Sequence, residues 1–212
     1  MNFTINHLYH IYNRGNNSDK VFYKHENYLY FLEKIKTHIL PYTDILAWCL
    51  MPNHFHLMLR VNCIELPVIN HSDILGHNIL VSTNKVKTYN DDDIKTQRNL
   101  NQSIGILLRS YTNAIQKQEG RTGSLFQSKT KAICLSNGKI DGIGNDFKEY
   151  DNSQNNYPKT CFHYIHQNPV KAGLVKKCKE WGYSSFQEYE KISPNNLVNL
   201  SLAEELGLWQ WQ

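Results

Sequence analysis

The run LMPNHFHLML, residues 50–59, constrains the fold of this chain more than any other stretch. Successive side chains of a β-strand point to opposite faces of a sheet, so the imidazoles of His54 and His56 are expected together on one face. The other, apolar face would carry Phe55, Leu57 and Leu59. Two neutral imidazoles on one rigid face can bind a divalent metal. The simpler alternative is a pair of solvent-facing histidines on an ordinary amphipathic strand.

The flanking sequence predicts a hairpin and a regular order of strands and helices. Apolar residues recur at helical spacing before Pro41, which should end that helix, and Pro52-Asn53 is typical of a tight turn between two strands. In the first strand of the hairpin, Ile45, Ala47 and Cys49 are expected on one face. The expected elements are a strand at 8–12, a helix at 25–40, strands at 44–50 and 54–61, a helix at 99–118, a strand within 125–135 and a helix at 159–167.

This order predicts the fold class. Strand–helix–strand–strand–helix–strand is typical of an α+β, ferredoxin-like fold, a split βαβ antiparallel sheet with helices on one face. The first and third strands would be the central pair, which places both histidines in the middle of a rigid sheet. We expect one domain over residues 1–190, with loop-rich insertions at about 62–98 and 136–156, and a C-terminal tail at 191–212 that packs on the domain.

Composition limits the functional classes. The chain has 23 basic and 19 acidic residues, a net charge of +4, which permits a nucleic-acid partner without requiring one. Its five cysteines are odd in number and form no C-x-x-C pair, so a disulfide framework or a cysteine zinc site is not expected. No apolar stretch approaches the roughly 20 residues that span a membrane, and no secretory signal is evident. These features favour a cytoplasmic location.

A second dense motif, CFHYIHQNPVKAG, occupies residues 161–173. Tyr164 and Asn168 are four residues apart, so on a helix they share a face. An amide oxygen is a suitable ligand for magnesium or manganese, and a phenolate can attack phosphorus once a nearby cation lowers its pKa from about 10. The alternative is a tyrosine packed in the core and an asparagine that caps the helix before Pro169, in a distorted last turn.

Other residues compete for these roles. Tyr111, Tyr150 and Tyr157 are rival nucleophiles, but none combines a helical position with a ligand-type residue four positions later. His163 and His166 share a helix side, yet no acidic partner typical of a zinc hydrolase lies nearby. We interpret His166 as a phosphate contact or a surface residue.

Taken together, the motifs resemble the single-tyrosine HUH transposases, and most of all their REP-associated tyrosine transposase branch. The matching segments occur in family order between about residues 8 and 190. They are YNRGN at 12–16, LMPNHFHL at 50–57, GRTGSLFQS at 120–128, YIHQNPVKAG at 164–173 and WGYSSF at 181–186.

The resemblance implies an HUH nuclease fold and a divalent metal, Mg²⁺ or Mn²⁺. It implies that His54 and His56 are metal ligands, that Asn168 is the third, and that Tyr164 attacks a DNA phosphate. The product would be a 5′-phosphotyrosine and a free 3′-hydroxyl, and rejoining to another 3′-hydroxyl would transfer the strand. The implied partner is single-stranded or hairpin DNA at the bacterial nucleoid, and relatives include both homodimers and monomers.

Basic side chains near these motifs are candidate phosphate contacts. They are Arg14, Arg121, Lys129, Lys131 and Lys171. The alternative for each is a solvated surface charge. The pair Lys129-Thr130 departs from the Arg-aromatic pair that is more usual in the family, and Lys binds phosphate as a point charge rather than as a fork.

Three functions are therefore open at this level. The leading one is a metal-dependent single-stranded DNA endonuclease and strand transferase, that is, a transposase or a domesticated relative. The second is a non-catalytic module that binds hairpin nucleic acid on a ferredoxin-like sheet. The third is a replication or conjugation nicking enzyme, although such enzymes usually carry further domains.

Overall fold

The computed structural model describes residues 1–66, 98–136, 157–192 and 195–209. The two expected loop-rich insertions, at about 62–98 and 136–156, lie almost entirely outside the described residues. The strands are β1 (Leu8–Arg14), β2 (Thr43–Met51), β3 (His54–Val61) and β4 (Lys131–Cys134). The helices are α1 (His25–His38), α2 (Leu100–Glu119), α3 (Tyr157–Lys171), α4 (Phe186–Tyr189) and α5 (Leu200–Glu205), with 3₁₀ turns at Asn16–Ser18, Leu40–Tyr42 and Cys178–Glu180.

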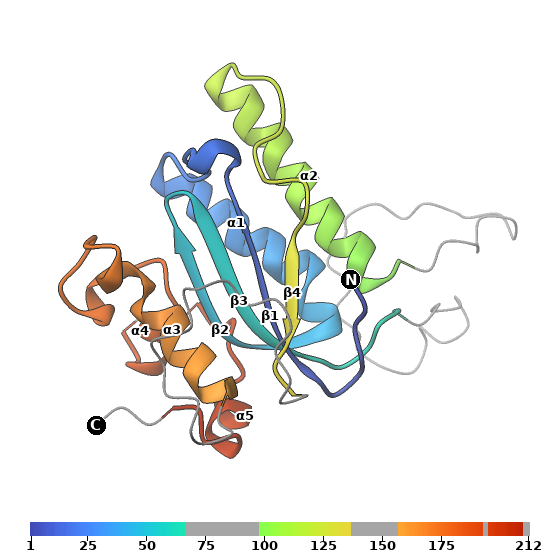
Figure 1. Ribbon diagram of the computed structural model, residues 1–212, viewed down its shortest axis with the longest axis vertical. Helices are drawn as coiled ribbons and strands as arrows, with labels where there is room; N and C mark the ends of the chain where they lie inside the picture. Colours follow the sequence, from blue (N-terminus) through green and yellow to red (C-terminus); the bar gives the residue numbers. More distant parts are fainter. Residues whose placement is uncertain (67–97, 137–156, 193–194, 210–212) are drawn as a thin grey trace, which may run out of the picture.

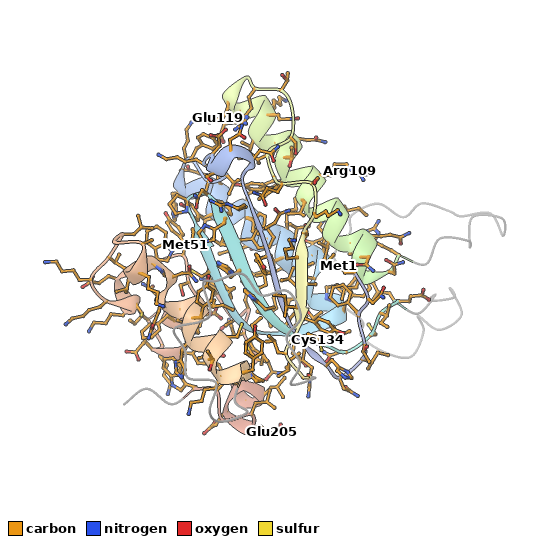
Figure 2. The ribbon with its side chains drawn as sticks, in the orientation of Figure 1. Met1, Met51, Arg109, Glu119, Cys134 and Glu205 are labelled. Carbon is orange, nitrogen blue, oxygen red and sulfur yellow. The ribbon has the colours of Figure 1, made fainter. Side chains whose placement is uncertain are left out.

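The four strands form one antiparallel sheet in the order β2-β3-β1-β4. β1 and β3 are the central pair, and β2 and β3 form the expected hairpin around Pro52-Asn53. Figure 2 shows Met51 and Cys134 toward opposite ends of this sheet. The α+β, ferredoxin-like fold class is confirmed, but the expectation that the helices share one face is wrong. α1 and α2 cover one face and α3 the other, because Leu46, Ala47 and Met58 make the second face apolar as well.

The sheet separates two hydrophobic cores. α1 and α2 cover one face, where they pack on Phe55, Leu57 and Leu59 of β3, as the alternation of β3 predicts. α3 lies across the opposite face, against β2 and β3 (Figure 1). Among the described residues, no helix is long and apolar enough to cross a membrane.

The prediction that Ile45, Ala47 and Cys49 share a face of β2 is wrong. Ile45 pairs with Leu59 but Ala47 already pairs with Met58, so Leu46 is an extra residue in β2. Such a bulge reverses the alternation of the strand. Ile45 therefore packs in the core under α1 and α2, while Ala47 and Cys49 pack in the core under α3.

Residues after α3 cover the outer edge of β2. The amide of Leu50 donates to the Tyr183 carbonyl, and the amide of Ser185 donates to the Trp48 carbonyl. Further along, the amide of Asn199 donates to the Ile45 carbonyl. An exposed strand edge invites pairing with other chains, so this segment closes that side of the sheet. In the tail, Leu197, Leu202, Ala203 and Leu208 are buried.

Candidate active site

The two histidines of β3 lie on the sheet face that α3 covers. Their rings meet edge to face, with centroids 4.9 Å apart and planes at 87°. His56 is only 4% exposed, and His54, next to the hairpin turn, is partly buried. The alternative of two solvent-facing histidines does not describe this pair.

β1 adds three side chains to the same face. Its register pairs Tyr12 with His56 and Arg14 with His54, and paired residues of antiparallel strands point to one side. His10 lies two residues before Tyr12 in β1, and its Nε2 is 2.9 Å from Nδ1 of His56. His10 and Tyr12 were not predicted as site residues. Their signal is the alternation in LYHIYNR, which places His10, Tyr12 and Arg14 on one face.

α3 brings Tyr164 and Asn168 to these histidines. The Tyr164 ring lies edge-on to His56, with centroids 5.5 Å apart, and a side-chain hydrogen bond joins Asn168 to His54. Asn168 Nδ2 also donates to the Tyr164 carbonyl at 3.0 Å. The helix runs through Pro169 to Lys171, further than expected, and Gly173 with φ +68° follows its end. Thus the four residues predicted for nucleophile and metal ligands lie together.

Burial keeps both β3 imidazoles neutral. It lowers the pKa of His54 from 6.5 to about 4, with a further decrease from the Arg14 charge that the Asn168 hydrogen bond opposes. Burial also lowers the pKa of His56 well below 6.5, and the neighbouring His10 and His54 add to this effect. Neutral imidazole is the form that binds metal ions.

The donor atoms fit a divalent cation. Nε2 of His56 is buried and has no hydrogen-bond partner among the described residues, so its lone pair suits a ligand. Nδ1 of His54 lies 2.6 Å from Oδ1 of Asn53, so Nε2 is the nitrogen that a metal would take, in exchange for the hydrogen bond to Asn168. Within the described ranges no three His, Cys, Asp or Glu side chains could hold a metal ion. The amide oxygen of Asn168, whose side chain is hydrogen-bonded to His54, is a donor type that also suits such a cation.

The interpretation of His166 as a phosphate contact or surface residue is wrong. His166 is fully buried, on the side of α3 that faces the C-terminal segment, and its Nε2 lies 2.8 Å from Oγ of Ser185. Of the rival tyrosines, Tyr111 lies in the other core and donates to the Val21 carbonyl, and Tyr157 is the first residue of α3. Tyr150 is outside the described residues.

The basic candidates are dispersed. Arg14 is exposed beside His54, and its Nη2 donates to Ser18 Oγ at 2.7 Å. Lys131 is exposed and pairs with Tyr12, so the register places it on the site face. Arg121 donates to the Tyr23 hydroxyl at 2.7 Å and lies 3.9 Å from the Asp19 carboxylate. Lys129 is exposed in the segment before β4, and Lys171 is exposed at the end of α3.

Two of the sequence motifs join at the hairpin end of the sheet. Nδ2 of Asn13 donates to the Gln127 carbonyl and to Oγ1 of Thr130, and the amide of Asn16 donates to the Leu125 carbonyl. The amide of Gly15 donates to the Asn53 carbonyl. These bonds hold the loop after β1 and the segment before β4 beside His54.

Comparison with known proteins gives one structural similarity. No family model matches the chain, and no curated protein matches it. A solved structure of a REP-associated tyrosine transposase bound to a REP hairpin has a similar fold, with a TM-score of 0.52 and 15% sequence identity. The match covers 94% of this chain and 89% of that one. At this identity the likeness shows a shared fold.

Proposed function

We propose that this chain is a metal-dependent transesterase of single-stranded DNA, which cuts hairpin-flanking DNA and transfers strands as a transposase does. One observation carries the proposal: α3 places Tyr164 and Asn168 against His56 and His54 of the central sheet. The fold shared with a hairpin-bound transposase agrees with it. The nucleophile and all three metal ligands of the motifs, Tyr164, His54, His56 and Asn168, are present. A module that only binds nucleic acid would need none of them, so we favour the enzyme.

The residues have complementary roles in this reaction. A divalent cation held by His54, His56 and Asn168 would supply a Lewis acid that neutralises charge on the scissile phosphate. Tyr164 Oη forms a bond to phosphorus and the bond to the 3′-oxygen breaks, so the phenol proton is replaced by phosphorus and the released 3′-oxygen gains a proton. The 5′-phosphotyrosine keeps the phosphodiester energy. Attack by another 3′-hydroxyl reverses the step and joins a new strand.

Sheet side chains would hold the DNA. Arg14 and Lys131 are on the site face, where their charges can contact phosphates on either side of the cut. Arg121, Lys129 and Lys171 would extend this contact, and Arg121 must exchange its Tyr23 and Asp19 partners to do so. A single strand suits the site better than a duplex because its backbone is flexible and its bases are free to stack on aromatic side chains.

Covalent capture tests the proposal. Purified full-length protein, with Mn²⁺ and labelled single-stranded hairpin DNA from the flanks of its gene, should give a shifted band that protease removes. Tyr164→Phe should give none. Tyr157→Phe, on the first turn of the same helix, is the matched control and should still form the band. Equal bands from Tyr164→Phe and wild type would disprove the assignment of the nucleophile.

A second outcome separates enzyme from binding module. If wild type binds the hairpin tightly but gives no covalent band with Mn²⁺ or Mg²⁺ on two different flanking substrates, the chain binds nucleic acid without cutting it. The non-catalytic hairpin-binding function would then replace the proposed one.

A further inference from the structure

His10 of β1 is a buried ionisable side chain that the mechanism above does not use, and it contacts a proposed metal ligand. Its Nε2 lies 2.9 Å from Nδ1 of His56, and the two rings are nearly parallel, with centroids 5.0 Å apart and planes at 22°. His10 is 0% exposed and His56 is 4% exposed. This hydrogen bond therefore forms away from water, between the two central strands.

The neighbouring strands hold both rings in place. Tyr12 stacks on His10, with centroids 4.8 Å apart and planes at 26°, and it also pairs with His56 in the β1–β3 register. On the other side of His56, Cys49 of β2 is its register partner and is fully buried. The His56 ring is thus enclosed by side chains on both flanking strands, and its Nδ1 has a defined partner.

The protonation of this pair decides what His56 can do. Both rings are buried, and the hydrogen bond between their nitrogens contains one proton, which one ring donates and the other accepts. If His10 were the donor, neutral His56 would carry its proton on Nε2. Once protonated, that nitrogen could not bind a metal. If His56 is the donor, its Nε2 lone pair is available.

We infer that His10 is a positioning residue for metal binding: its Nε2 accepts the Nδ1–H of His56, fixes that ring, and leaves Nε2 of His56 to coordinate a divalent cation. The inference rests on the metal site of the proposed function. Outer hydrogen-bond partners of metal-ligating histidines set the tautomer and orientation of the ring, and their loss weakens metal binding by about 10–100-fold. Here that partner is an uncharged imidazole rather than the more common carboxylate or carbonyl.

Two substitutions separate hydrogen bonding from packing. His10→Gln keeps an acceptor at a similar reach, whereas His10→Leu has a similar volume and no acceptor. In calorimetric titrations of the metal-free full-length protein with MnCl₂ alone, His10→Leu should bind Mn²⁺ about 10–100-fold more weakly than wild type, and His10→Gln should recover most of that loss.

Cys49→Ala is the matched control, because it alters packing on the other flank of His56 without removing the bond to His10. Its Mn²⁺ affinity should stay close to that of wild type.

A spectroscopic readout tests the tautomer directly. Long-range nitrogen–proton NMR spectra of the metal-free protein should show His56 protonated at Nδ1 in wild type and in His10→Gln, and this preference should be lost in His10→Leu. Two results would overturn the role of His10 without affecting the metal site. One is a wild-type His56 protonated at Nε2, and the other is Mn²⁺ binding by His10→Leu as tight as that of wild type. Failure of the wild-type protein to bind Mn²⁺ would overturn the metal site and this inference together. Were His10→Leu to unfold, weak Mn²⁺ binding by a folded His10→Gln would also count against the inference.

Discussion

At the residue scale, the site depends on side chains that a strand and a helix place within contact distance. His54 and His56 were identifiable because a strand must place residues two apart on one face. Tyr164 and Asn168 were identifiable because a helix places residues four apart on one face. The alternation of β1 places His10 on a face with Tyr12 and Arg14, but its contact with His56 was not identifiable, since that contact depends on the register between β1 and β3.

Removal of either imidazole should weaken metal binding and abolish DNA cleavage. His54→Ala or His56→Ala leaves one nitrogen donor and one amide, so Mn²⁺ affinity should fall by more than about 100-fold, beyond the effect of losing an outer partner, and DNA cleavage should disappear. Calorimetry with MnCl₂ and the covalent-capture assay measure both effects. His7→Ala is the control, because His7 precedes β1 at the end of the sheet opposite the hairpin turn, where its ring contacts the Ile5 carbonyl. Normal cleavage by either site variant would refute the ligand assignment.

The loop after β1 requires a glycine at position 15, because it has no space for a side chain there. A Cβ at this position would overlap the Asp19 carbonyl oxygen, so Gly15→Ala must displace the loop after β1. We expect a loss of about 1–3 kcal/mol in the free energy of unfolding, measured by urea denaturation. At Gly105 of α2 an added Cβ meets nothing within 4 Å, and Gly105→Ala should instead stabilise by about 0.5–1 kcal/mol. Equal effects of the two substitutions would contradict this explanation.

At the scale of elements, local pattern identified each strand and long helix, and long-range contacts adjusted their ends and faces. β3 has the predicted bounds, His54–Val61. The bulge at Leu46 was not predictable, because an extra residue in β2 is defined only by its pairing with β3. The burial of His166 depends in the same way on Ser185, which lies 19 positions later.

Glu188 of α4 connects three separate segments. It is only 6% exposed, and its carboxylate accepts from Nε1 of Trp48 at 2.8 Å and from the amides of Leu197 at 2.8 Å and Val198 at 3.3 Å. These bonds attach the C-terminal segment to β2. The two carboxylate oxygens accept bonds from three donors. A glutamine would replace one of these oxygens by an NH₂ group, which cannot accept, so at least one donor would lose its partner.

Glu188→Gln should therefore destabilise the protein by about 1–3 kcal/mol, the usual cost of a buried group without a partner. The midpoint of urea unfolding should fall at an unchanged m-value. Glu190→Gln is the control, since Glu190 is exposed just after the same helix and should shift the midpoint little. A similar shift for both variants would mean that the carboxylate of Glu188 contributes only a surface charge.

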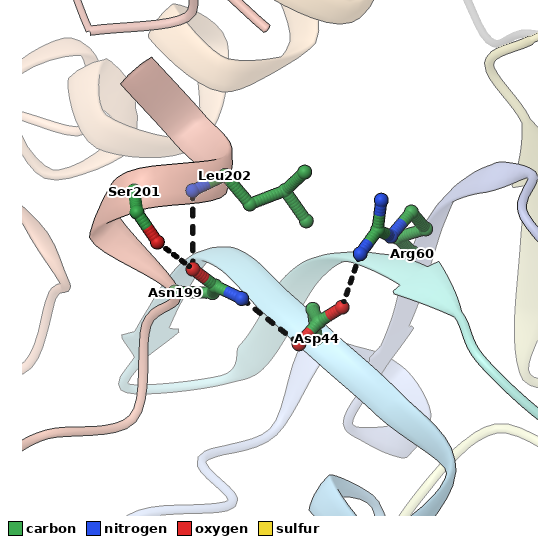
Figure 3. A network of polar contacts seen from close by, with 5 residues as sticks. All are labelled: Asp44, Arg60, Asn199, Ser201 and Leu202. Atoms are coloured by element: carbon green, nitrogen blue, oxygen red, sulfur yellow. Dashed lines mark hydrogen bonds and ion pairs between the residues drawn. The ribbon is translucent and has the colours of Figure 1, made fainter. Parts of the chain in front are cut away.

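At the scale of the whole molecule, a polar network joins the sheet to the last helix. Asp44 of β2 accepts from Nη2 of Arg60 at 2.9 Å and from Nδ2 of Asn199 at 3.0 Å. Oδ1 of Asn199 in turn accepts from the amide of Leu202 in α5 (Figure 3). Burial acts to raise the pKa of Asp44, but the hydrogen bonds from Asn199, Arg60 and Asn62 outweigh it and lower the pKa below 3.8.

The lowered pKa sets the direction of a pH dependence. Because folded Asp44 holds its proton less tightly than the unfolded chain does, its contribution to stability is present above its ordinary pKa of 3.8 and is lost as pH falls through the lower folded value. Asp44→Asn should cost about 0.2–1 kcal/mol at pH 7, typical of a partly exposed ion pair. Its difference from wild type should shrink in unfolding measurements below pH 3.8. A difference independent of pH between 7 and 2.5 would show that the charge of Asp44 is not involved.

Most of the fold and the motif residues follow from local pattern in the chain. Periods of two and of three to four residues identify the strands and helices, and their order predicts a split βαβ sheet with β1 and β3 at its centre. The spacing within His54-Phe55-His56 and between Tyr164 and Asn168 predicts which side chains act together. These properties depend on neighbours in sequence, and backbone geometry alone enforces them.

The remaining features of the fold and the site depend on the packing of segments that are distant in sequence. The position of α3 over β3, the bulge that turns Ile45 away from Ala47, and the burial of His166 all require partners many residues away. So does the bond between His10 and His56, which links residues 46 apart. No local pattern encodes such contacts, because they depend on strand register and on the balance of burial over the whole chain.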